Sequence, residues 1–124
     1  MNDDLNATLS KLEGHVSALQ AVIDLIGDRQ YLPREDVDRV RDQMRGAKQA
    51  IEIAYRSGST VKGEAALTDA EMRYYQPAVH EAFTRLPSLS TRPGPKWLGQ
   101  LFDAKGTFEW YIDQIRTELG AAAG

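Results

Sequence analysis

The sequence contains no cysteine in its 124 residues, which excludes disulfide bonds, thiolate nucleophiles and cysteine-ligated zinc sites. It contains only two histidines, His15 and His80. Neither follows a glutamate by three residues, so the Glu-x-x-His pairs of carboxylate di-iron bundles are missing. We therefore expect no metal and no cofactor, and we expect both histidines to lie at the surface.

Other signatures of catalysis and of membrane insertion are also missing. No apolar run approaches the roughly 18 residues of a membrane-spanning helix, and the start, MNDDLNATLSK, lacks the pattern of a secretory signal. Gly58 and Gly63 lack the Lys-Ser/Thr ending of a phosphate-binding loop. No serine has an evident base beside it. These absences predict a cytoplasmic protein that is not an enzyme and does not contact a membrane.

The overall charge is weak, at −3, with 27% charged and 42% hydrophobic residues. Such a composition is ordinary for a globular protein, and the length suits one domain spanning residues 1–124. A small negative net charge gives no general attraction to nucleic acid, so any such contact would depend on a local basic cluster.

Apolar residues recur in steps of three and four in the first half of the chain, which indicates amphipathic helices. The first set predicts a helix over about 3–26, ended by Gly27: Leu5, Leu9, Leu12, Val16, Leu19, Ile23 and Ile26. The second predicts a helix over 33–57 that starts at Pro33: Val37, Val40, Met44, Ala47, Ile51 and Ala54.

A third helix is expected over 69–86, because Thr68 and Glu71 have the spacing of a capping box. Leu67 and Met72 are placed to form the accompanying hydrophobic staple. Pro77 falls opposite the apolar stripe, so we predict one helix kinked at this proline rather than two short helices. The stripe comprises Met72, Tyr75, Val79, Ala82 and Leu86.

The fourth helix is expected over 95–119, with Pro95 as its first residue and a frayed tail over 120–124. Lys105 and Gly106 interrupt its apolar stripe and mark a break, a close helix approach or a weak turn. Four such helices with short to moderate connections predict an all-α, up-down-up-down antiparallel four-helix bundle.

Several large apolar side chains point away from these stripes. Ile53, Tyr74 and Trp110 fall near one end of the predicted bundle, with Tyr55 and Tyr111 at the edges. Tryptophan and tyrosine dominate interface hot spots, so this patch predicts an interaction module (an adaptor, regulator or inhibitor) that binds a protein or itself. The alternatives are scattered exposed residues, or a core broader than the stripes.

A basic cluster is expected at the opposite end, with Tyr31 and Trp97 among its members: Arg29, Arg34, Arg85, Arg92 and Lys96. Basic residues interleaved with aromatics can bind phosphates and stack on bases, so a nucleic-acid-associated regulator is the second hypothesis. Acidic residues at the same end dilute this charge, and the alternative is a solvated loop region. An enzyme ranks third.

Overall fold

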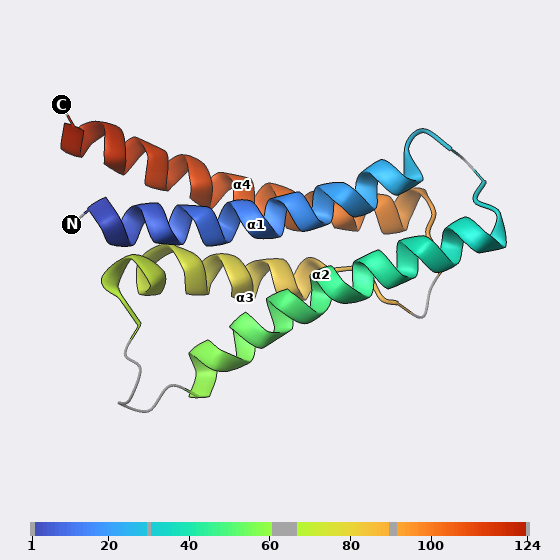
Figure 1. The fold of residues 1–124 in the computed structure, drawn as a ribbon, viewed down its shortest axis with the longest axis horizontal. Helices are drawn as coiled ribbons and strands as arrows, with labels where there is room; N and C mark the ends of the chain where they lie inside the picture. The colour runs from blue at the N-terminus through green and yellow to red at the C-terminus, as the bar shows by residue number, and fades with distance from the viewer. Residues whose placement is uncertain (1, 30, 61–66, 90–91, 124) are drawn as a thin grey trace.

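The computed structural model describes residues 2–29, 31–60, 67–89 and 92–123. Its four α-helices are α1 (Asn2–Ile26), α2 (Arg34–Thr60), α3 (Gln76–Arg85) and α4 (Pro95–Ala123). A π-helical turn, η1 (Glu71–Tyr75), leads directly into α3. Figure 1 shows the helices running alternately in opposite directions along one long axis.

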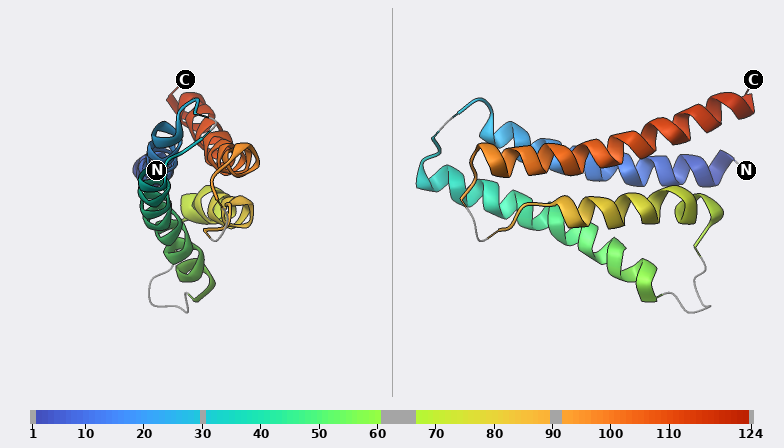
Figure 2. Two further views of the ribbon diagram at one scale, coloured as in Figure 1. Left: turned by 90° about the vertical axis from the view of Figure 1, so that its right-hand side faces the viewer. Right: turned by 180° about the vertical axis from the view of Figure 1, so that it is seen from behind.

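Each helix packs against two neighbours, which confirms the predicted four-helix bundle. α1 contacts α2 and α4, and α3 contacts the same two helices from the other side. Within the described residues, the diagonal pairs α1/α3 and α2/α4 are not in contact. The views in Figures 1 and 2 show α2 diverging from the other helices toward its C-terminal end. The C-terminal part of α2 therefore lies away from α1, while Tyr55 still packs against His80 and Phe83 of α3.

The most buried line of α1 differs from the predicted stripe. It includes two polar residues, Thr8 at 1% exposed and His15 at 8% exposed. Leu5, Leu9 and Val16, which were expected at the centre of the stripe, are only partly buried at its edge. The central line comprises Thr8, Leu12, His15, Leu19, Val22 and Ile26. The helix is thus turned so that a neighbouring face, not the purely apolar one, points into the bundle.

Two helix boundaries predicted from local signals are confirmed, whereas α2 begins at Arg34, one residue after Pro33, and ends at Thr60, three residues past the predicted end at 57. Gly27 has a φ of 59°, and its N–H donates to the Ile23 carbonyl oxygen at 2.9 Å. This left-handed conformation is one that glycine adopts without steric cost. At the other confirmed end, the Glu71 N–H donates to Thr68 Oγ1 at 3.1 Å, and the Thr68 N–H donates to Glu71 Oε1 at 3.2 Å. This reciprocal pair is the predicted capping box.

The helix around Pro77 is continuous, as predicted, but a π-helical turn accommodates the proline. The Gln76 N–H donates to the Glu71 carbonyl, five residues back instead of four. Pro77 follows immediately and has no N–H to donate. A π turn is one of the recognised ways in which a helix absorbs such an interruption.

The π turn also moves the apolar face, and it makes one predicted position wrong. Ala70 and Tyr75, five residues apart, are both buried, so the inserted residue shifts the phase between them. Met72 is 62% exposed and does not belong to the core, and the staple predicted with Leu67 does not bury it. The stripe resumes its predicted phase at Tyr75 and continues to Val79.

α4 starts at Pro95 as predicted and runs to Ala123, four residues past the predicted end at 119. It continues through Gly106 without a break, and Lys105 forms an ion pair with Glu109 at 3.4 Å beside the core.

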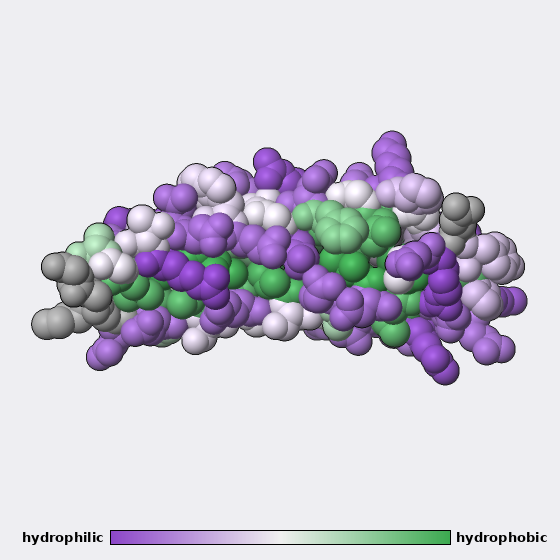
Figure 3. Space-filling model, turned by 90° about the horizontal axis from the view of Figure 1, so that it is seen from above, coloured by the Kyte–Doolittle hydropathy of each residue, from purple (hydrophilic) through white to green (hydrophobic). Residues whose placement is uncertain are grey.

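Hydrophilic side chains cover much of the face above α1 and α4, with apolar residues visible along its middle (Figure 3). Within the residues that the structure describes, no helix combines the length and the apolar character that crossing a membrane demands.

Candidate contact surface between helices α3 and α4

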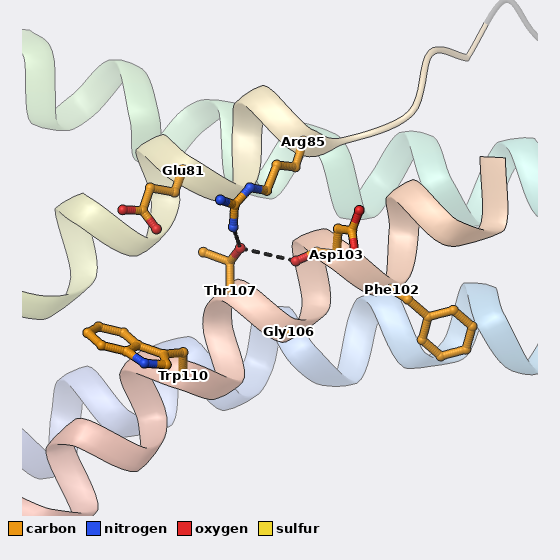
Figure 4. Close-up of a pocket in the computed structure, with 7 residues that line it drawn as sticks. All are labelled: Glu81, Arg85, Phe102, Asp103, Gly106, Thr107 and Trp110. Carbon is orange, nitrogen blue, oxygen red and sulfur yellow. Dashed lines mark hydrogen bonds between the residues drawn. The ribbon is translucent and has the colours of Figure 1, made fainter. Parts of the chain in front are cut away.

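A hollow of about 570 Å³ lies between α3 and α4, on the side of the bundle away from α1 and α2. Figure 4 shows its lining side chains, two from α3 and five from α4. They are Glu81, Arg85, Phe102, Asp103, Gly106, Thr107 and Trp110. We call this set the α3–α4 surface.

Two exposed aromatic side chains flank the hollow along α4. Trp110 is 57% exposed and Phe102 is 47% exposed, and they project from the helix on opposite sides of Gly106 (Figure 4). A spacing of four residues on either side of the glycine places all three on neighbouring turns of one helix face. A Cβ built on Gly106 would meet no atom within 4 Å, so open space lies above this position. The glycine therefore leaves a gap between two large apolar groups.

The side of the hollow next to α3 is polar. Arg85 Nη1 donates to Thr107 Oγ1 at 2.5 Å, and the Thr107 hydroxyl donates to the Asp103 carbonyl oxygen at 3.0 Å. The Tyr111 hydroxyl donates to Glu81 Oε1 at 3.2 Å, and burial together with the Glu81 charge raises the pKa of Tyr111. These bonds tie α3 to α4 and hold the charged groups at set heights along the two helices.

Arg85 and Glu81 keep unused hydrogen-bonding capacity on this surface. No ion pair within the described part of the chain includes either residue. Both residues are exposed. A guanidinium carries five N–H donors, and Arg85 uses one of them on Thr107. A ligand or partner can therefore still pair with both charges.

The structure brings together only part of the predicted aromatic patch. Trp110 and Tyr111 contact each other edge to face, with ring centroids 4.8 Å apart. Tyr74 lies against the last turns of α4, where its hydroxyl donates to Glu118 Oε2 at 3.1 Å. Ile53 is 58% exposed, but it is on α2, which does not contact α4 among the described residues. Ile53 is therefore separate from the α3–α4 surface.

Phe102 belongs to this surface, although reasoning from the sequence did not select it. The available signal was the repeat of large, small and large residues at Phe102, Gly106 and Trp110, in steps of four. Gly106 was interpreted as a possible break in the helix, so this repeat was not recognised. In the structure Gly106 lies inside a regular helix.

The predicted basic end is only partly assembled. Arg29 forms an ion pair with Asp36 at 2.6 Å, and Arg92 Nη2 donates to the Leu32 carbonyl oxygen at 2.7 Å. The Arg92 guanidinium also lies 5.6 Å from the centre of the Tyr31 ring. Arg34 and Lys96 are exposed, and Lys96 lines a hollow together with Arg92.

Two residues expected at the basic end do not contribute to it: Arg85 lies elsewhere, and Trp97 is buried. Arg85 sits in the α3–α4 hollow, opposite the middle of α4, because α3 ends well short of that end of the bundle (Figure 1). Trp97 is only 3% exposed, and its Nε1–H donates to the Ser88 carbonyl oxygen at 2.9 Å. A buried indole cannot stack on a base.

The expectation that both histidines lie at the surface is wrong for His15. Its ring stacks between Phe108 and Tyr75, with centroid distances of 5.0 and 5.8 Å, and Nε2 lies 2.8 Å from the Tyr75 hydroxyl. Burial lowers the pKa of His15. His80 is exposed, as expected, and contacts the Tyr55 ring.

Among the described residues, no group of three or more histidine, aspartate or glutamate side chains is arranged to hold a metal ion. The fold thus defines an all-α four-helix bundle with exposed aromatic side chains on its α3–α4 surface. Comparisons of this chain with protein-family models, with curated proteins and with solved structures found no match.

Proposed function

We propose that this chain is a protein–protein interaction module, an adaptor, regulator or inhibitor, that binds through the α3–α4 surface. The observation that carries the proposal is the exposure of Trp110 and Phe102 on either side of the Gly106 gap. Keeping two such groups in water is unfavourable, and burying them against a partner recovers the hydrophobic free energy. Tryptophan is also enriched among the residues that dominate binding energy.

The surface is held rigid by what lies behind it. Leu101, Ala104 and Phe108 alternate with the exposed residues along α4, and all three are fully buried. The Arg85–Thr107 and Tyr111–Glu81 hydrogen bonds fasten the same stretch of α4 to α3. A preorganised surface loses little conformational entropy on binding. This arrangement therefore favours a docking role for the exposed groups over a role in a flexible loop.

The second hypothesis, a nucleic-acid-associated regulator, has weaker support. Arg92 and Lys96 line a separate hollow of about 390 Å³ that includes no acidic residue. Against this, the only tryptophan near those cations, Trp97, is buried. Cytoplasmic location and the lack of enzymatic activity also remain part of the proposal, and they rest on the sequence composition.

The proposed function is tested by capturing partners from the native host on the immobilised chain and on two matched variants. Trp110→Ala removes the main anchor, whereas Ile53→Ala removes an equally exposed apolar group from α2. We expect specific proteins on the wild type and on Ile53→Ala, and their loss from Trp110→Ala. Circular dichroism confirms that both variants keep their helices.

Equal capture by all three proteins would overturn the proposed surface. Captured nucleic acid that is released steeply as salt rises would instead favour the second hypothesis, because neutralised phosphates release counterions. Arg92→Ala with Lys96→Ala should then abolish the capture.

A further inference from the structure

The shape of the α3–α4 surface is complementary to itself. Trp110 is a projection and Gly106 is a gap, one helical turn apart on one face of α4. If a second copy is laid on this face with its α4 antiparallel, the Trp110 of each copy lies over the Gly106 of the other. The two-fold axis for this arrangement crosses α4 at the level of Phe108, midway between them. Interfaces of this isologous kind use the same patch on both partners.

The charges on α3 are complementary under the same operation. Glu81 and Arg85 are exposed and one helical turn apart. Turning a second copy by a half-turn about an axis across α3 places the Glu81 of each copy against the Arg85 of the other. That axis crosses α3 at the level of Phe83. Two Glu81–Arg85 ion pairs would then form between the copies. Within the described chain neither residue has an ion pair.

One axis satisfies both requirements, because two hydrogen bonds within each copy align α3 with α4. Arg85 is bonded to Thr107 and Glu81 to Tyr111, so the levels of α3 and α4 are aligned by two contacts. With this alignment, Phe83 is level with Glu109. Phe108, the axis position required by the aromatic pair, is one residue away, or about 1.5 Å along the helix. The shape and the charge pattern therefore specify the same dimer.

We infer that the partner for the α3–α4 surface is a second copy of this chain, in a two-fold dimer with α4 packed antiparallel on α4 and α3 on α3. The inference rests on the proposed function and names its partner. Each Trp110 fills the other copy's Gly106 gap, and Glu81 and Arg85 pair across the interface. A contact limited to two helices is small, and small interfaces are typical of weak, reversible association.

Sedimentation velocity over concentrations from about 10 μM to about 1 mM tests the shape of the interface. We expect the wild type to pass from monomer to dimer, and Trp110→Ala to remain monomeric. Gly106→Ala is the sharper variant, because its methyl group meets nothing in the monomer and alanine stabilises a helix relative to glycine. The same methyl group occupies the gap that the other copy's Trp110 needs. We therefore expect a more stable monomer that dimerises at least tenfold more weakly.

Charge reversal tests the two-fold relation. Glu81→Arg alone and Arg85→Glu alone each place like charges in opposition, so each should remain monomeric. An equimolar mixture of the two variants should form a heterodimer, and the double variant Glu81→Arg/Arg85→Glu should regain dimerisation that each single variant loses. Arg45→Glu, on the exposed side of α2, is the control that should leave dimerisation unchanged.

The inference is overturned by a wild type that stays monomeric up to about 1 mM, by undiminished dimerisation of Gly106→Ala, or by failure of the mixed variants to pair. Its failure is distinguishable from failure of the proposed function. If the wild type is monomeric and Trp110→Ala abolishes its capture of host proteins, the proposed function is supported and the dimer is not. If the wild type dimerises but captures the same host proteins as Trp110→Ala, the dimer is supported and the wider function is not.

Discussion

His15 on α1 and Tyr75 on the π turn share a buried hydrogen bond, with 2.8 Å between Nε2 and the hydroxyl oxygen. The two residues are 60 positions apart in the chain. Lys11 lies 5.4 Å from the centre of the same tyrosine ring and forms an ion pair with Glu71 at 2.9 Å. The π turn is therefore attached to α1 by one neutral contact inside the bundle and one charged contact at its surface.

The first prediction concerns the pH dependence of stability. Burial lowers the pKa of His15 from its ordinary 6.5, so below that pH the unfolded chain binds a proton that the folded chain resists. The contribution of neutral His15 to the free energy of unfolding should therefore be fully present above pH 6.5, and the free energy should fall as the pH decreases below that value. His15→Gln should flatten this slope between about pH 7 and about pH 5, as measured by urea titration.

Glu71 provides the internal control for that experiment. Burial acts to raise its pKa, but the contacts with Lys11 and Thr68 outweigh burial and lower the pKa below its ordinary 4.5. Its contribution is present above pH 4.5 and is lost at lower pH, outside the histidine window. An unchanged slope in His15→Gln above pH 5 would show that another group titrates there.

The second prediction concerns Thr8, which is 1% exposed and whose Oγ1 has no hydrogen-bond partner among the described residues. An unpaired buried hydroxyl costs about 1–3 kcal/mol. Thr8→Val has nearly the same shape and removes that hydroxyl, so it should raise the free energy of unfolding by about 1 kcal/mol. Chemical denaturation measures the change. A destabilised variant would indicate that a water molecule satisfies the hydroxyl.

The third prediction separates the two faces around the π turn. Met72 is 62% exposed whereas Val79 is fully buried. Met72→Ala should change the free energy of unfolding by less than about 0.5 kcal/mol, as is usual for surface positions. Val79→Ala leaves a cavity and should cost about 2 kcal/mol. Comparable losses at the two positions would mean that the helix lacks the π turn in solution.

The fourth prediction tests the capping box. Thr68→Val removes the oxygen that accepts from the Glu71 N–H, and such caps are worth about 1 kcal/mol. We expect the loss in a thermal or chemical unfolding curve, with little change in the α3–α4 surface. Thr68→Ser retains the acceptor and should lose much less.

Local signals in the sequence predicted most of the fold. Gly27, Thr68 with Glu71, and Pro95 each act through backbone groups within a few residues, so their roles can be recognised without knowing the tertiary structure. The α2 stripe also lies where it was predicted, since all its central positions are apolar. These features determined the number, order and approximate ends of the helices.

The predicted positions that failed depend on distant partners. Thr8 and His15 were assigned to the outside of the α1 stripe because they are polar, but Tyr75 and Phe108 make a buried site for the imidazole. The π turn lies just before Pro77, and apolar periodicity alone could not indicate the inserted residue. The candidate surface was predicted only in part for a related reason. Heptad position showed that Trp110 points outward, but not that Arg85 lies beside it.

The pairing of α1 with α4 has a consequence for synthesis of the chain. Arg116 and Glu13 form an ion pair at 2.9 Å although they are 103 positions apart. α1 precedes α4 in the chain, so the apolar side of α1 that α4 covers is synthesised before its cover. Contacts of such long separation form late in folding. The nascent chain therefore exposes this side until α4 has been made, and a chaperone that recognises apolar helical segments would find a binding site there.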